Sequence, residues 1–410
     1  MKNNRTFLEK LLDGSEVEWR TIAEISNKVS SGGTPATSNN SYYENGNIPW
    51  LRTQEVDFKE IWDTDIKITE EGLNNSSAKW IPENCVIIAM YGATVGKIAI
   101  NKIPLTTNQA CANIEVNSEI AHYRYVFHYL MSQYEYIKSL GSGSQTNINA
   151  QIVKKIKIPI PPLSVQTEIV KILDALTALT SELTSELTLR RKQYEYYREK
   201  LLSVDNLKLS TENIQWVKLN DLGELIRGNG LQKKDFTETG VPAIHYGQIY
   251  TYYGTFATKT KSFVSPELAK KLKKVDCGDV VITNTSENFE DVGKAMVYLG
   301  KEQAVTGGHA TIFKPNHEKI LSKYFVYLTQ TSFFTNEKRK YAKGTKVIDV
   351  SATDMAKIIL PIPPLKEQQR IVSILDKFET LSNSITEGLP LSIEQSQKRY
   401  EYYRELLLSF

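Results

Sequence analysis

Apolar residues recur along residues 165–202 at alternating steps of three and four, which is the spacing of a helix that packs along one side. The positions that carry this spacing are Ile169, Ile172, Leu176, Leu179 and Leu183. Such an a/d seam is typical of helices that pack as a coiled coil. At ~1.5 Å per residue, a helix from about Val165 to about Leu202 would form a rod of roughly 55 Å.

A second seam with the same spacing lies near the carboxyl end of the chain. Its positions are Ile371, Ile374, Phe378, Leu381 and Ile385. Gly388 and Pro390 follow this seam, and because both residue types interrupt helices we expect a break or kink there. Each seam is too short for a free-standing filament, so we expect the two helices to pair with each other in antiparallel fashion. Docking onto a partner helix is the competing interpretation.

Both seams belong to a longer sequence repeat. Each copy opens on an apolar run that ends in Pro-Ile-Pro-Pro-Leu, at 159–163 and 361–365, and closes with Tyr-Glu-Tyr-Tyr-Arg-Glu, at 194–199 and 400–405. The Pro-Pro pairs hold the chain extended, so each helix begins just after them. A repeat of this length fixes the architecture, and two copies indicate a duplicated two-part protein rather than a solenoid.

The amino terminus continues the same repeat. Residues 7–12 echo residues 199–202, and a tryptophan follows each run, at Trp19 and Trp216. The repeat is therefore circular. This predicts that the two termini lie close together and that an amino-terminal segment, residues 1–18, packs with the long helices.

Two regions of similar length, residues 19–158 and 206–360, alternate with the helical repeats. Both consist of short apolar and aromatic runs separated by turn residues, which is typical of mixed α/β domains with many short strands. The two regions match weakly but in order; for example, residues 95–97 correspond to residues 292–294, each Val-Gly-Lys. We predict an α+β fold: two mixed α/β domains separated by a pair of long antiparallel coiled-coil helices, with pseudo-two-fold symmetry.

Composition limits the class of protein. The 410 residues suit two to three domains, and 41% hydrophobic residues are enough to form cores. A formal net charge of +3 gives no global basic field. Cys85, Cys111 and Cys277 form no CxxC pair, and no apolar run approaches ~20 residues. We expect a cytoplasmic protein without disulfides, structural zinc or a membrane-spanning segment.

The sequence offers no recognisable motif for catalysis. A DNA methyltransferase would need a glycine-rich cofactor loop and an Asn/Asp-Pro-Pro-aromatic motif, and neither is present. Residues 92–97 lack the spacing of a phosphate-binding loop, and Ile98 stands where Ser or Thr is required, so we expect a hairpin turn. The five histidines have no metal-ligand spacing. We therefore expect a non-catalytic chain with no metal site.

The repeated Pro-Ile-Pro-Pro-Leu helix with its Tyr-Glu-Tyr-Tyr-Arg-Glu ending, alternating with two variable domains, resembles the DNA-specificity subunit of type I restriction–modification systems. The resemblance covers essentially the whole chain, and its order of motifs is highly specific. Even the tandem Thr-Ser-Glu-Leu at 180–183 and 184–187 is similar to the short tetrapeptide repeat of some family members. The implied target-recognition domains are residues 19–158 and 206–360, with helical spacers at residues 159–205 and 361–410.

Membership of this family would imply that each domain reads one half of a split target in double-stranded DNA, with the paired helices setting the spacing. It would also imply methyltransferase subunits docked along the helices and a motor-nuclease subunit in the larger complex. S-adenosylmethionine, ATP and Mg²⁺ would then belong to those partners and not to this chain. Two domains related by an approximate two-fold axis suit half-site geometry. The competing hypothesis is a non-catalytic coiled-coil assembly scaffold whose domains bind proteins rather than DNA.

Candidate contact residues follow from the chemistry of recognition. Base reading needs bidentate donors and acceptors on loops or helix ends, and phosphate contact needs cations and hydroxyls. In the first domain, the candidate DNA-binding residues are Ser31, Gly33, Thr34, Arg52, Thr53, Gln54, Tyr91, Thr94, Lys97, Asn108 and Gln109. In the second domain, they are Arg227, Asn229, Lys233, His245, Tyr246, Gln248, Asn284, Thr285, Ser286, Lys294, Lys343 and Lys346. The alternative for each is an ordinary polar turn.

The tyrosines that close the two repeats form a second candidate surface. A narrow rod has too little interior to bury every ring, so we expect some of them to pack at the rod ends and some to contact a partner. The candidate partner-binding residues are Tyr194, Tyr197, Tyr400 and Tyr403.

Overall fold

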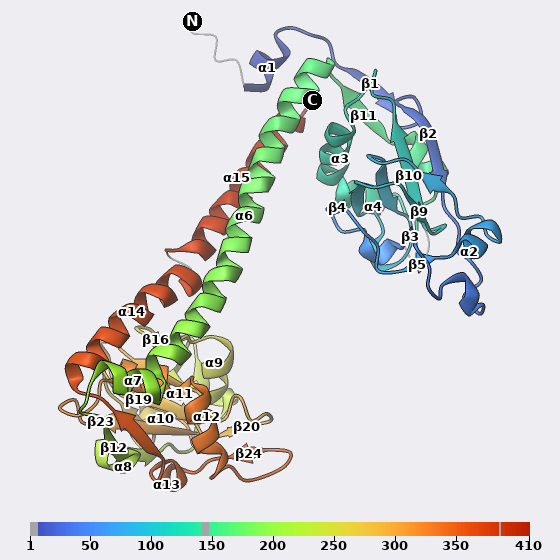
Figure 1. Cartoon of the computed structure of the whole chain (residues 1–410). Helices are drawn as coiled ribbons and strands as arrows, with labels where there is room; N and C mark the ends of the chain where they lie inside the picture. The colour runs from blue at the N-terminus through green and yellow to red at the C-terminus, as the bar shows by residue number, and fades with distance from the viewer. Residues whose placement is uncertain (1–6, 142–146, 385–386) are drawn as a thin grey trace, which may run out of the picture. The chain divides into compact units, whose positions relative to one another are not determined.

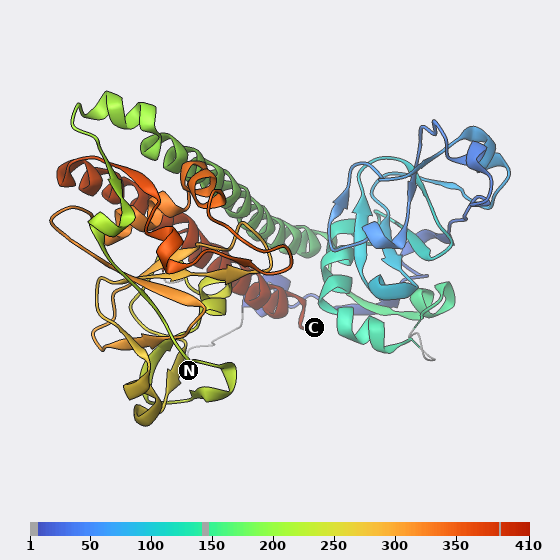
Figure 2. The same cartoon turned by 90° about the horizontal axis from the view of Figure 1, so that it is seen from below.

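The computed structural model of the chain describes residues 7–141, 147–384 and 387–410. The chain divides into two compact units (Figures 1 and 2). Unit 1 comprises residues 1–184 and 392–410, and unit 2 comprises residues 185–391. Each unit contains a domain of β-sheets and short helices together with part of the long helices, so the circular repeat predicted from the sequence is confirmed.

Unit 1 is built from short strands and short helices around a long one. Its strands are β1 (Glu18–Thr21), β2 (Ser26–Ser31), β3 (Ile48–Leu51), β4 (Glu60–Ile61), β5 (Lys67–Ile68), β6 (Trp80–Ile81), β7 (Val86–Ala89), β8 (Ile98–Asn101), β9 (Leu105–Thr107), β10 (Cys111–Val116) and β11 (Lys157–Ile160). Its helices are α1 (Phe7–Leu12), α2 (Glu70–Asn74), α3 (Tyr123–Ser132), α4 (Tyr134–Ser139), α5 (Ala150–Lys155), the first part of α6 (Leu163–Leu202) and most of α15 (Leu389–Leu408). The strand orders are β2-β10-β7-β8-β4, β5-β3-β9-β6 and β1-β11.

The sheet around β7 separates two hydrophobic cores. All four residues of β7 are buried, and they alternate between the two cores because successive side chains of a strand point to opposite faces. Val86 and Ile88 join the core that contains α3 and the start of α6, whereas Ile87 and Ala89 join a core against the second sheet. The first core attaches the domain to the long helix, and the second supports the loops at the far side.

Unit 2 repeats this plan with its own set of elements. Its strands are β12 (Gln215–Lys218), β13 (Gly223–Arg227), β14 (Phe236–Thr237), β15 (Val241–Ile244), β16 (Phe256–Ala257), β17 (Ser262–Val264), β18 (Lys273–Val275), β19 (Val280–Thr283), β20 (Thr285–Ser286), β21 (Ala295–Tyr298), β22 (Ala304–Thr306), β23 (Ala310–Pro315), β24 (Ile348–Asp349) and β25 (Ile359–Ile362). Its helices are the second part of α6, α7 (Val204–Ser210), α8 (Leu219–Leu222), α9 (Tyr246–Thr251), α10 (Pro266–Lys271), α11 (Ser322–Thr329), α12 (Ser332–Arg339), α13 (Ala352–Met355) and α14 (Leu365–Asn383).

The strand orders of unit 2 match those of unit 1 in their main sheet. They are β13-β23-β19-β21-β16, β14-β17-β15-β22-β18, β12-β25 and β20-β24. Here β19 occupies the place of β7, with Val280 and Ile282 in the core against α11 and Val281 in the core on the opposite face. The predicted fold of two related α/β domains with long helices is therefore confirmed.

The long helices run antiparallel within each unit. In unit 1, the hydroxyl groups of Thr180 on α6 and Ser396 on α15 lie 2.8 Å apart, and Leu407 shares a core with Val165. In unit 2, the rings of Tyr197 on α6 and Phe378 on α14 stack with centroids 5.5 Å apart. In unit 1, early residues of the first repeat copy thus contact late residues of the second copy. In unit 2, late residues of the first copy contact earlier residues of the second, as antiparallel pairing of the two copies predicts.

The predicted seams are only partly correct. Ile169 and Ile371 are fully buried, as the seams predict, whereas Leu179 and Leu381 are 39% and 37% exposed. Leu173 and Leu375, which lie outside the predicted seams, are fully buried instead. The long helices pack on the domain helices α3 and α11 as well as on each other. Because of this second contact, the line of buried residues on each long helix faces partly toward the domain. Ile385 lies outside the described residues.

The second long helix is interrupted, as predicted. It ends as α14 at Asn383 and resumes as α15 at Leu389. Gly388 has a φ of +85°, and a Cβ at this position would lie 2.5 Å from the carbonyl oxygen of Thr380. Only glycine fits such a left-handed and crowded position, so the sequence places the break here.

The amino-terminal segment lies against the carboxyl end of the chain within unit 1. Leu11 and Leu12 of α1 pack on the core that contains Leu407 and Leu408. Residues 1–6 lie outside the described residues. Among the helices of the described ranges, none combines the length and the apolar character needed to cross a membrane.

A glutamine of the repeat joins each domain to its long helix. Gln166 is fully buried; its side-chain oxygen accepts a hydrogen bond from the backbone N–H of His122 (2.8 Å), and its amide donates to the carbonyl of Pro161 (2.8 Å). Gln368 does the same in unit 2, accepting from the N–H of Leu321 and donating to the carbonyl of Pro363, both at 2.9 Å. One side chain thus satisfies backbone groups on two segments.

We expect the substitution Gln368→Ala to destabilise unit 2 by about 2–3 kcal/mol, because it strands buried backbone groups without partners. For a unit of this size, that loss lowers the melting temperature by about 5–10 °C. Gln369→Ala is the matched control, since Gln369 is exposed on the same helix. Differential scanning calorimetry of both variants measures the difference, and equal melting temperatures would contradict the assigned role.

Candidate nucleic-acid interface

Four turns at the ends of strands meet on one side of the unit 1 domain. They follow β2, β3, β7 and β9, and we call them together the unit 1 face (residues 31–34, 52–54, 91–94 and 108–109). The N–H of Gly33 donates to the carbonyl of Thr107 (2.9 Å), and the N–H of Asn108 donates to the carbonyl of Leu51 (2.9 Å). The hydroxyl of Thr34 donates to the side-chain oxygen of Gln109. The turns predicted from the sequence are therefore brought together.

The third turn of the unit 1 face is fixed by its own hydrogen bonds. The hydroxyl of Thr94 donates to the carbonyl of Thr53 (2.8 Å), and residues 92–94 form a short 3₁₀ turn between β7 and β8. The stretch that resembles a phosphate-binding loop in composition is therefore a hairpin turn, as expected.

The corresponding turns of unit 2 also meet, and we call them the unit 2 face (residues 227–229, 245–248, 284–286, 307–309 and 343–349). The guanidinium Nε of Arg227 donates to the carbonyl of Gly308 (3.2 Å). The N–H of Asn284 donates to the carbonyl of His309 (2.8 Å), and Thr285 Oγ1 lies 2.9 Å from His309 Nδ1. The rings of Tyr246 and His309 lie 4.9 Å apart.

The candidate residues differ widely in exposure, which separates those able to touch DNA from those that shape the turns. The exposed ones are Ser31, Gln54, Tyr91, Gln109, Arg227, Asn229, Lys233, Lys343 and Lys346. The half-buried ones are Thr34, Arg52, Thr94, Lys97, Asn108, Tyr246, Gln248, Ser286 and Lys294. The buried ones are Gly33, Thr53, His245, Asn284 and Thr285. All of them stay predictions as DNA contacts.

Several of the candidate cations form ion pairs within the chain. Lys97 Nζ lies 2.6 Å from Asp57 Oδ1, Lys343 Nζ lies 2.9 Å from Asp354 Oδ2, and Arg227 lies 4.0 Å from Asp349. Hydrogen bonds from Lys357 and Lys343 hold the pKa of Asp354 well below its usual range. Among the described residues, Lys233 and Lys346 have no such ion pair, so their charges are fully available to phosphates.

The buried imidazole of His245 is neutral near pH 7. Burial, together with the charges of Lys233 and His309, lowers its pKa. Its Nδ1 accepts a hydrogen bond from the N–H of Gly247 (3.2 Å), which a protonated ring would not allow. The side chain therefore caps α9 and fixes the turn that carries Tyr246.

His309 and Asp349 belong to the unit 2 face but were not among the residues predicted from the sequence. The signal for His309 was its place three residues beyond a strand, on the turn that corresponds to the one carrying Asn108 and Gln109 in unit 1. His309 is exposed and contacts Tyr246 and Thr285. It can present a ring nitrogen to a base edge, whereas His245, the histidine predicted from the sequence to bind DNA, is buried.

The tyrosines that end the two repeats are mostly engaged within the chain. Tyr194 is 7% exposed and donates to Gln330 (3.3 Å), and burial raises its pKa to about 12. Tyr400 and Tyr403 pack on the core of unit 1, and Tyr197 is 40% exposed where it stacks on Phe378. The most exposed rings at these ends are Tyr196 and Tyr402, at 58% and 62%. The four predicted partner contacts stay predictions.

A buried lysine supports the loop that carries Lys294. Lys338 on α12 is 4% exposed and donates to the carbonyl of Val292 (2.6 Å). Burial lowers its pKa to about 8 from the ordinary value of 10.5. Between these two values the unfolded chain binds more protons than the folded one, so stability rises with pH.

We expect the free energy of unfolding of the natural chain, relative to Lys338→Met, to increase by at most about 1.4 kcal/mol per pH unit between pH 8 and 10. The Met variant has no titrating group at this position, and all other groups cancel in the difference. Denaturant titrations of both proteins across this range measure it. A difference that stays constant with pH would show that Lys338 titrates normally.

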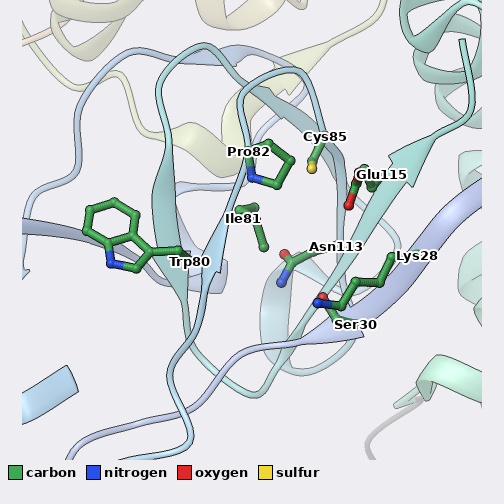
Figure 3. Close-up of a pocket in the computed structure, with 8 residues that line it drawn as sticks. All are labelled: Lys28, Ser30, Trp80, Ile81, Pro82, Cys85, Asn113 and Glu115. Carbon is green, nitrogen blue, oxygen red and sulfur yellow. The ribbon is translucent and has the colours of Figure 1, made fainter. Parts of the chain in front are cut away.

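Figure 3 shows a small cavity in unit 1. Its volume is about 20 Å³, and its lining includes Lys28, Trp80, Cys85, Asn113 and Glu115. A space of ~10–15 Å³ holds one water molecule, so this cavity has no room for a nucleotide or cofactor. Within the described ranges, no cluster of three or more His, Cys, Asp or Glu side chains is arranged to hold a metal ion.

Comparisons with known proteins agree with this architecture. The family profile described as type I restriction modification DNA specificity domain matches twice, over residues 14–189 and 211–395. A Haemophilus influenzae protein that bears the name of a type I restriction enzyme specificity subunit is 39% identical, with 100% of both chains covered. The specificity subunit of the Escherichia coli type I restriction enzyme EcoR124I/EcoR124II is 31% identical, over 99% of this chain and 97% of that one.

A solved structure shares the fold. It is the S subunit of a type I restriction-modification system from M. genitalium, with a TM-score of 0.57 and 16% identity over 97% of each chain. Two family matches, one to each unit's domain, follow the duplication seen in sequence and structure. The chain belongs to the type I restriction modification DNA specificity family.

Proposed function

We propose that the chain is the DNA specificity subunit of a type I restriction–modification complex. The unit 1 face and the unit 2 face each read one half of a split target in double-stranded DNA. The bases between the two halves go unread, and the length of the long helices determines how many there are.

The observation that supports this proposal most is that one backbone plan carries two sets of side chains. Arg52 follows β3 where the buried His245 follows β15; Gln109 is the second residue after β9, and the exposed His309 is the third residue after β22. Guanidinium, amide and imidazole groups select different base edges. Two faces with the same frame and different donors suit two unrelated half-sequences, which a scaffold with matched protein-binding domains would not need.

We further propose that this chain performs no chemistry. Methyltransferase subunits dock along the helices, and a motor-nuclease subunit joins the larger complex. S-adenosylmethionine, ATP and Mg²⁺ act in those subunits. The name of the E. coli relative as a specificity subunit of a restriction enzyme supports assembly with other subunits.

The test is a binding selection with the assembled complex and a library of random duplexes at moderate salt. We expect enrichment of two short defined blocks separated by a fixed number of unread positions. The complex lacking this chain is the control and should enrich no such motif. Enrichment of a single unsplit motif, or of none even at low salt, would contradict the proposal.

A further inference from the structure

Each copy of the repeat carries an aspartate eight residues after its buried glutamine. The pairs are Gln166 with Asp174 and Gln368 with Asp376. Residues seven or eight apart lie on the same face of a helix, and in both units this face is turned toward the helix of the domain. The reading faces do not involve either aspartate, so their role is not explained by base or phosphate contacts.

Asp174 forms the joint between α6 and the domain of unit 1. Its Oδ2 accepts from Arg124 Nε (2.5 Å), its Oδ1 accepts from Arg124 Nη2 (2.8 Å), and Oδ1 also lies 2.8 Å from His128 Nε2. Arg124 and His128 both belong to α3. Burial acts to raise the pKa of Asp174, but the hydrogen bonds from His128 and Arg124 outweigh it and lower the pKa. The carboxylate is therefore charged at neutral pH and bound in a bidentate manner.

Asp376 occupies the corresponding place in unit 2 with different partners. Its Oδ2 accepts from Lys323 Nζ (2.7 Å), and its Oδ1 lies 2.6 Å from the hydroxyl of Tyr327, which also lies 2.8 Å from Glu379 Oε2 on the same helix as Asp376. Both partners lie on α11, at the positions that Arg124 and His128 hold on α3. The aspartate is the same in the two units although the groups that bind it differ. The two copies therefore share a polar contact between the long helix and a helix of the domain, α3 or α11.

We propose that Asp174 and Asp376 are positioning residues that fix the angle of each reading domain on its long helix, and so determine how strictly the complex selects the gap between half-sequences. This inference rests on the proposed function. With the glutamine, each aspartate gives a second point of attachment about 12 Å further along the helix. Two points resist rocking of the domain about the first one.

A stiff joint is needed because each base pair of extra gap displaces a half-site by ~3.4 Å and rotates it by about 35° around the DNA axis. A domain that rocks on its helix can follow such a change at little cost. A domain held at two points cannot, so targets with a wrong gap lose binding. The half-sequences themselves are read by the faces and are unaffected.

The test maps methylated sites in cells that express the complex with the natural chain, with Asp174→Ala, with Asp376→Ala or with both substitutions. We expect the same two half-sequences in every case. The ratio of methylation at gaps one base pair too long or too short to methylation at the natural gap should rise at least tenfold in the double variant. Each single variant should show a smaller rise.

The control is Glu168→Ala, because Glu168 lies on the same helix and pairs only with Lys171 of that helix among the described residues (2.6 Å). Asp174→Asn and Asp376→Asn, which keep the shape of the side chain, serve if an alanine variant fails to accumulate. An unchanged gap ratio in folded variants, or an equal loss at all gaps, would overturn the inference. If the natural complex marks no split sequence at all, the proposed function fails instead.

Discussion

A third copy of Thr-Ser-Glu-Leu inserted after Leu187 is expected to change the gap between the two half-sequences and to leave the half-sequences themselves unchanged. The four residues extend α6 by about 6 Å and add roughly 40° of rotation beyond one full turn. A base-pair step is ~3.4 Å, so we expect the preferred gap to grow by about one or two base pairs. Mapping of methylated sites in cells that carry the complex measures the new gap.

The matched control keeps the length of the helix and changes its surface. Thr184→Ala combined with Ser185→Ala alters two exposed positions of the tandem and should leave the gap as it was. If the insertion leaves the gap unchanged while the complex still methylates DNA, the helix does not determine the spacing, and the mechanism proposed for the long helices is wrong.

Arg227→Ala should weaken binding of the natural target by about 10- to 100-fold, since one bidentate base contact contributes ~1–3 kcal/mol. It should also relax the preference at one base position, and only in one half-sequence. Arg227 is exposed on the unit 2 face, where its Nε donates a hydrogen bond to the carbonyl of Gly308. Binding selections with the complex report both effects in one experiment.

Arg370→Ala is the control, because its side chain has nearly the same exposure, 47% against 51% for Arg227, and lies on α14 outside the face. Lys346→Ala provides a contrast, since the loss of a phosphate contact weakens binding to all DNA sequences alike. It should also reduce the slope of the logarithm of the binding constant against the logarithm of the salt concentration by about one. A uniform loss in the Arg227 variant would mean that Arg227 contacts phosphate and not a base.

The sequence was most informative where a repeat and a periodicity coincide. The duplication, the start of both helices after Pro-Pro and the interruption at Gly388 follow from local chemistry, and the structure confirms them. The seam was less accurate: Leu179 and Leu381 satisfy the coiled-coil spacing but are exposed. Spacing alone cannot reveal that a helix packs on two neighbours, since the domain helix that attracts Leu173 and Leu375 is distant in sequence.

The same limit applies to the candidate site. Most of the candidate residues lie on turns that follow strands, and the structure brings these turns together into one face in each unit. Which of them point outward depends on packing between turns: His245 is buried as a helix cap, whereas His309, which the pattern of polar residues did not single out, is exposed on the face. The sequence shows that the glutamine and the aspartate are repeated in both copies, but only the fold shows which groups their side chains bind.

The central sheet of each unit, with alternate residues in separate cores, has a consequence for how such proteins diversify. In β7, Val86 and Ile88 serve attachment to the helices while Ile87 and Ala89 serve the side that supports the loops. Mutations that remodel one layer leave the other intact. New DNA specificities can therefore accumulate by substitution in the layer under the loops while the residues that attach the domain to the helices are kept.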